Sequence, residues 1–107
     1  MEVYNQAHAL ARALQESDVY KKYSECKDKV EEDPQAKEML GDYQDLIKNL
    51  QEEYMKGGEI SEEESEKHDK MKDVILLNPL IKEFFEAEHR LGVVLMDIQK
   101  IISEAVI

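Results

Sequence analysis

Residues 78–107 read NPLIKEFFEAEHRLGVVLMDIQKIISEAVI, and this stretch predicts one long helix that runs to the C-terminus. Asn78 and Pro79 form a helix start, because an asparagine side chain accepts from free N–H groups and a proline at the first position loses no hydrogen bond. The helix would run for about 28 residues, or roughly 42 Å at 1.5 Å per residue. A globule of this length of chain has a diameter of only about 34 Å, so we expect an elongated molecule.

The apolar face of this helix is wide. Its large apolar side chains cover roughly 200° of a helical wheel, more than a single neighbouring helix can cover. A stripe of that size usually marks an interface, although the other helices of the same chain could also cover it. We expect a homo-oligomer, either a dimer or a tetramer, because two-fold association lets one patch serve both subunits. The main candidates for core and interface are Phe84, Phe85, Leu91, Leu95, Ile98 and Ile102.

One charged residue, Glu88, falls inside this apolar arc. A carboxylate at such a position must find a partner or lose its hydration without compensation. We therefore expect Glu88 to be largely buried and hydrogen-bonded to a polar side chain of another helix, where it would fix the packing register. The alternative interpretation places Glu88 at the polar centre of a binding groove.

The rest of the chain is also helical in pattern, and strand-like alternation is absent. Segments 2–16 and 18–32 form either two helices or one bent helix. A third helix starts at Asp33-Pro34 and ends near Gly57, and a fourth starts with a capping box at Ser61 and runs to about Leu77. The predicted fold class is all-α: an elongated antiparallel helical bundle of four to five helices with a long C-terminal helix, forming a single helical domain over residues 1–107.

Charge and composition argue against several function classes. The net charge is −11 and no segment carries a basic run, which disfavours direct binding to nucleic acid or to an anionic membrane surface. The longest apolar run, residues 93–96, is far too short to cross a bilayer. The single cysteine cannot form an internal disulfide, so a reducing, cytoplasmic setting fits best.

Few residues suggest chemistry. Cys26 lies on an apolar helical face and is interpreted as a small buried side chain. Glu86 and His89 have the spacing used in di-iron bundles, but the second copy that such a site needs is missing. The glutamates between residues 59 and 66 meet the positive end of a helix dipole; a docking patch for a basic partner is the alternative. We predict no catalytic residue, cofactor or metal site.

Several stretches, taken together, resemble the YlbF/YmcA family along essentially the whole chain. They are residues 7–14, residues 16–23, the Asp33-Pro34-x-Ala36 turn, and residues 78–88 and 95–102. The resemblance implies a small helical, oligomeric, cytoplasmic protein, mainly found in Gram-positive bacteria. Some members regulate competence, sporulation and biofilm formation as complexes with sister proteins, and they influence messenger-RNA processing by a membrane-bound endoribonuclease.

Members of that family that bind iron–sulfur clusters use cysteines near the C-terminal end. The corresponding residues here, 103–107, include no cysteine, so cluster binding is not carried over. The predicted function is a non-enzymatic regulatory or adaptor protein that acts by homo-oligomerisation and by binding proteins of the same family or a regulatory complex. The alternative is a subunit of a metal- or iron–sulfur-linked redox sensor.

Overall fold

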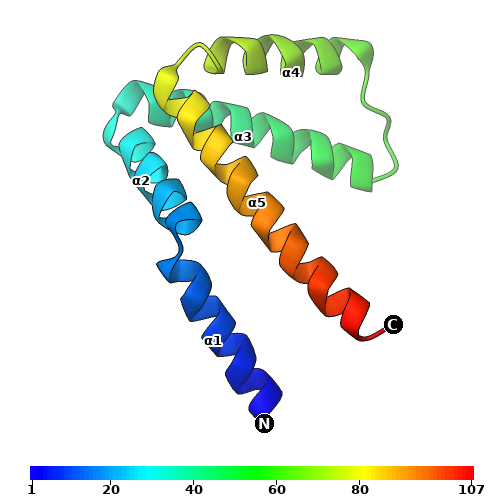
Figure 1. Ribbon diagram of the computed structural model, residues 1–107. Coiled ribbons are helices and arrows are strands. Elements are labelled where there is room, and N and C mark those ends of the chain that lie inside the picture. Colours follow the sequence, from blue (N-terminus) through cyan, green and yellow to red (C-terminus); the bar gives the residue numbers. More distant parts are fainter. The chain divides into compact units, whose positions relative to one another are not determined.

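The computed structural model describes residues 1–107 and consists of five helices without a strand (Figure 1). Helices account for 87% of the residues, which confirms the all-α class and the long C-terminal helix. In chain order the helices are α1 (Glu2–Glu16), α2 (Asp18–Glu32), α3 (Pro34–Met55), α4 (Glu62–Ile75) and α5 (Pro79–Ala105).

The helix starts follow from local capping chemistry. The Ala36 N–H donates to Asp33 Oδ1 at 3.0 Å, and the Glu64 N–H donates to Ser61 Oγ at 3.1 Å. The Leu80 N–H donates to Asn78 Oδ1 at 3.0 Å. These contacts satisfy N–H groups that a helix start leaves without an internal partner, so α3, α4 and α5 begin where the sequence predicts.

Ser17 lies between α1 and α2, and its conformation shows that they are two helices and not one bent helix. Its backbone is extended, with φ −71° and ψ 150°, and its hydroxyl lies 2.6 Å from the Leu14 carbonyl oxygen. The same Oγ accepts from the Tyr20 N–H at 3.2 Å. Ser17 therefore ends one helix and caps the next.

The chain divides into two units, and α2 and α5 each continue from one into the other. The first unit contains residues 1–28 and 84–107, which are α1, most of α2 and most of α5. Its buried side chains are Cys26, Phe84 and Ala87, and the rings of Tyr23 and Phe84 pack with centroids 5.6 Å apart. This contact joins α2 to α5. The expectation of a single domain stays a prediction.

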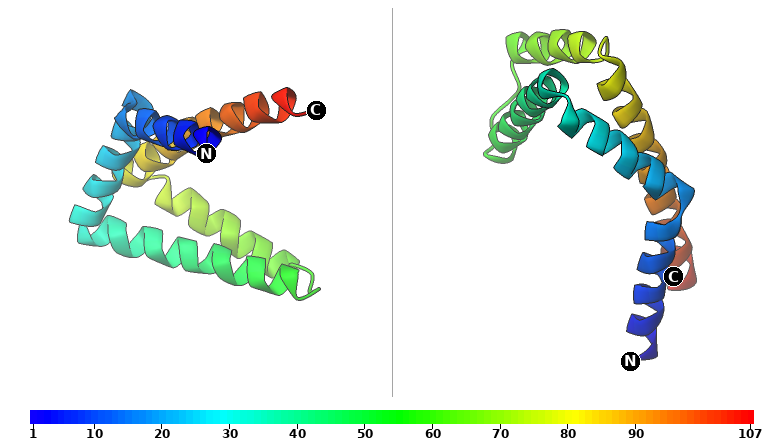
Figure 2. Two further views of the ribbon diagram at one scale, coloured as in Figure 1. Left: turned by 90° about the horizontal axis from the view of Figure 1, so that it is seen from below. Right: turned by 90° about the vertical axis from the view of Figure 1, so that its left-hand side faces the viewer.

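The second unit contains residues 29–83, in which α3 and α4 form an antiparallel hairpin (Figures 1 and 2). Ala36, Leu40 and Tyr43 of α3 and Ile75 of α4 are buried. A polar contact also links the two helices, because Tyr43 Oη lies 3.1 Å from His68 Nε2. None of the five helices has the length and apolarity needed to cross a membrane.

Candidate functional site

The structure divides the six predicted core and interface residues of α5 according to their burial. Phe84 is buried, while Phe85, Leu91 and Ile98 are half-buried. Leu95 is 41% exposed and Ile102 is 54% exposed. The N-terminal members therefore belong to the core of the first unit, and the exposed members follow further along the helix.

These apolar residues share one line along α5. Phe84, Leu91, Leu95, Ile98 and Ile102 are separated by seven, four, three and four residues. Counting the seven-residue step as two turns, the steps average 3.6 residues per turn, close to the 3.5-residue repeat by which helices pack side by side in coiled coils and bundles. We call the part of this line from Leu91 to Ile102, whose members are half-buried or exposed, the α5 seam. On a helical wheel, Asp97 and Glu104 fall on the opposite side of α5 from the seam.

A second seam with the same spacing occurs on α1. Val3, Ala7, Leu10 and Leu14 are separated by four, three and four residues, and we call them the α1 seam. No residue of α1 is buried, and of the seam only Leu14 is half-buried, so the rest of the chain covers little of this face.

The two seams occur in the same unit. The start of α1, at the N-terminus, and the end of α5, at the C-terminus, lie toward the same end of this unit (Figure 2). The first unit therefore presents two antiparallel helices whose apolar lines remain largely in contact with solvent.

The prediction that Glu88 is buried is wrong for the chain as it stands. Glu88 is exposed, and the chain has no buried charged side chain. Glu88 lies one turn after Phe84 and three residues before Leu91, and its side chain stays exposed. A helical wheel shows which residues share a face but not where the other helices lie, and for this reason it could not establish the burial of Glu88.

The comparisons with known proteins show the family. The family model described as "Control of competence regulator ComK, YlbF/YmcA" matches residues 3–107. The chain belongs to the YlbF/YmcA family. Among the relatives of this YlbF/YmcA chain, a UPF0342 protein of Halothermothrix orenii is 44% identical over 95% of this chain and 86% of its own length. A UPF0342 protein of Symbiobacterium thermophilum is 38% identical over 97% and 93%.

Two solved structures share the fold. A protein of unknown function (DUF964) from Bacillus stearothermophilus aligns with a TM-score of 0.94 at 20% identity, over 99% of this chain and 93% of that one. A chain of the crystal structure of Bacillus subtilis RicA in complex with RicF aligns with a TM-score of 0.70 at 23% identity, over 98% of this chain and 93% of that one. At these identities the likeness supports the helical fold of the YlbF/YmcA chain and nothing finer.

The residues that could carry chemistry in this YlbF/YmcA chain are scattered. Cys26 is a buried free thiol in α2. His8 and His89 are exposed, while His68 contacts Tyr43 and Asp69. No three His, Cys, Asp or Glu side chains are grouped so that they could hold a metal ion. The seams of α1 and α5 are therefore the candidate functional site.

Proposed function

We propose that this chain is a regulatory protein without a catalytic centre, which acts by associating with proteins. It forms a homo-oligomer, a dimer or a tetramer, through the α1 and α5 seams, and the oligomer binds other proteins of its family or a regulatory complex. The setting is the cytoplasm, as the lone cysteine suggests. The family name points to control of competence, and an influence on messenger-RNA processing belongs to the same proposal.

The observation that carries this proposal is the pair of exposed seams. Each seam has the spacing that lets a helix pack against another along its length. A second copy would bring a matching pair of helices, and a two-fold arrangement would cover all four seams at once. The crystal structure of RicA in complex with RicF contains a chain of this fold bound to a second protein, and this supports a role based on association.

Charge substitutions in the α5 seam test the proposal. Leu95→Asp and Ile102→Asp would each place an unpaired carboxylate in the interface, and each should raise the dissociation constant of the oligomer on the order of 100-fold. Both residues are exposed in the single chain, so the helices themselves should persist.

The matched control is Met96→Asp. Met96 is 69% exposed and lies about 100° around the helix from Leu95, away from the seam. Light scattering coupled to size exclusion measures the mass of each variant, and circular dichroism checks the helix content. The proposal fails if the Leu95 and Met96 variants keep the same mass as the wild-type chain.

A further inference from the structure

A second apolar surface occurs on the hairpin of α3 and α4, in the other unit of the chain. A groove of about 480 Å³ lies beside the C-terminal half of α3 and is lined almost entirely by apolar atoms. Its apolar lining residues are Ile47, Leu50, Tyr54, Met55 and Ile60, and Gln51 and His68 complete it. We call it the hairpin groove.

Local structure explains how the hairpin groove forms. Ile47, Leu50 and Tyr54 share one face of α3, being three and four residues apart. Gly57 then adopts a φ of +86°, which side chains disfavour, and the Gly58 N–H donates to the Glu53 carbonyl oxygen at 3.0 Å. This turn ends α3 and returns the chain toward α4, so that Ile60 completes the groove.

The side chains at the mouth of the groove are large, apolar and uncovered. Tyr54 is 70% exposed and Met55 is 85% exposed. Exposed apolar groups that border a concave surface usually mark a site where another molecule binds. Methionine suits such a site, because its flexible side chain adapts to a partner's shape.

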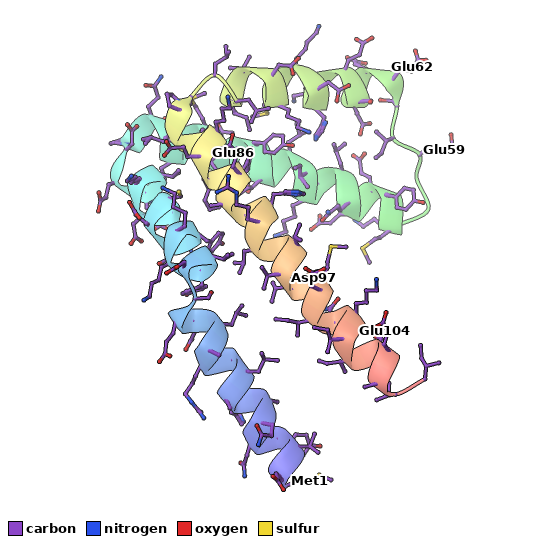
Figure 3. The ribbon with its side chains drawn as sticks, viewed as in Figure 1. Met1, Glu59, Glu62, Glu86, Asp97 and Glu104 are labelled. Carbon is purple, nitrogen blue, oxygen red and sulfur yellow. The ribbon has the colours of Figure 1, made fainter.

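The stretch of chain that supplies several of the lining residues is strongly acidic, and we call the glutamates of residues 51–64 the rim of the groove. Residues 51–64 contain six glutamates and one lysine, and Glu59 and Glu62 lie on the connection and at the first turn of α4 (Figure 3). The glutamates of α4 are explained by the helix dipole, since they occupy the positive end of that helix. That explanation covers only part of the rim.

Glu52 and Glu53 are not explained by the fold. They occur in the last turns of α3, where the dipole is negative and carboxylates are disfavoured, and the only basic residue nearby, Lys56 at the C-cap, compensates the charge of Glu53 in part. A hydrogen bond with Glu64 and the charge of Glu64 together raise the pKa of the Glu53 carboxyl group. The rim therefore brings like charges together at a cost that a cationic partner would remove.

We propose that the hairpin groove binds an amphipathic basic helix of a partner protein. Two or three apolar side chains of that helix would occupy the groove, and flanking lysines or arginines would contact the glutamates of the rim. A second copy of this chain fits poorly, because the chain carries a net charge of −11 and has no basic run. This site does not depend on the self-association proposed for the seams, since it uses other residues in the other unit.

Three fluorescent peptides of about 16 residues, long enough to form a helix on binding, test the proposal against the full chain. The first has leucines spaced three and four apart with flanking lysines. The second replaces the lysines with glutamates, and the third replaces the leucines with serines. Fluorescence anisotropy should show binding of the first peptide alone.

Variants of the chain then locate the site. Met55→Ser, Ile60→Ser and Glu53→Gln should each weaken binding of the lysine peptide, by roughly tenfold for the two apolar residues. The matched controls are Leu77→Ser and Glu38→Gln, which change an exposed leucine and an exposed glutamate outside the groove. Glu38 lies about 21 Å along α3 from Glu52.

Several results would overturn the proposal. One is equal binding of the lysine and glutamate peptides, because the acidic rim would then contribute nothing. A second such result is that the Met55→Ser and Ile60→Ser variants bind the lysine peptide as tightly as the wild-type chain does. Sedimentation of the same samples tests whether the groove takes part in self-association. A loss of the oligomer in the Met55→Ser variant would show that a second copy of the chain, and not a partner helix, occupies the groove.

Discussion

At the scale of single residues, Tyr43 belongs to a chain of polar contacts within the hairpin. Asp69 can only accept hydrogen bonds, so with a neutral imidazole His68 Nδ1 donates to Asp69 Oδ1, 3.2 Å away. His68 Nε2 then accepts from the Tyr43 hydroxyl at 3.1 Å. Burial, and to a smaller extent the negative charge of Asp69, raise the pKa of the Tyr43 phenol.

The first prediction follows from this raised pKa. Asp69→Asn should lower the pKa of Tyr43 only in part, because burial is the larger cause and remains. Since the folded pKa lies above the unfolded value of about 10, the associated stability is fully present below that value and is lost as the pH rises through the folded pKa. Ultraviolet titration of the chain, with the titration curve of the Tyr43→Phe variant subtracted, measures the pKa of Tyr43. A pKa at the unperturbed value of about 10 would contradict the prediction.

A second prediction concerns Ile81, which is fully buried in the hairpin unit. Ile81→Ala should lower the free energy of unfolding by about 2–5 kcal/mol, through lost apolar burial and the cavity left behind. Val74→Ala is the control, because Val74 is exposed and should change stability by less than about 0.5 kcal/mol. Urea unfolding at one fixed protein concentration compares them, and equal midpoints would show that Ile81 contributes nothing to the core.

At the scale of helices, the boundaries could be predicted closely from the sequence. Asp33, Ser61 and Asn78 each mark a start by a side chain that caps its own following turn, and Gly57 marks an end. These signals are local, so they need no knowledge of distant contacts. The differences are confined to the ends: α3 stops at Met55, α4 at Ile75 and α5 at Ala105, one or two residues before the expected positions.

The third prediction tests one such cap. Asp33→Ala should lower the free energy of unfolding by about 1 kcal/mol, because the Ala36 N–H loses its acceptor. Asp33→Asn should retain most of the stability, since an amide oxygen also accepts from that N–H. Thermal unfolding followed by circular dichroism provides the measurement, and an alanine variant as stable as the asparagine variant would argue against the cap.

At the scale of the whole molecule, the sequence could not show which apolar faces are covered. The wheel found the line that contains Phe84, Glu88 and Leu95, but a helical pattern is the same whether a face meets its own chain or another chain. Burial depends on where the other helices lie, and in this chain they cover Phe84 and leave Leu95 exposed. The hairpin groove was missed because it depends on the turn at Gly57.

The fourth prediction uses the net charge. Two chains of charge −11 repel each other, so self-association through uncharged seams should become tighter when salt rises from about 20 to about 500 mM, as the repulsion is screened. Binding of the lysine peptide to the hairpin groove should become weaker over the same range, because there the charges attract. Sedimentation and anisotropy measure the two effects, and salt dependences of the same sign would contradict at least one assignment.

Self-association is the central claim, and the mass of the wild-type chain in solution tests it most directly. Sedimentation equilibrium at micromolar concentration and moderate salt should give two or four times the chain mass of 12.5 kDa. A single species of 12.5 kDa across the concentration range would mean that the seams of α1 and α5 stay open in solution, and the proposed function would lose its physical basis.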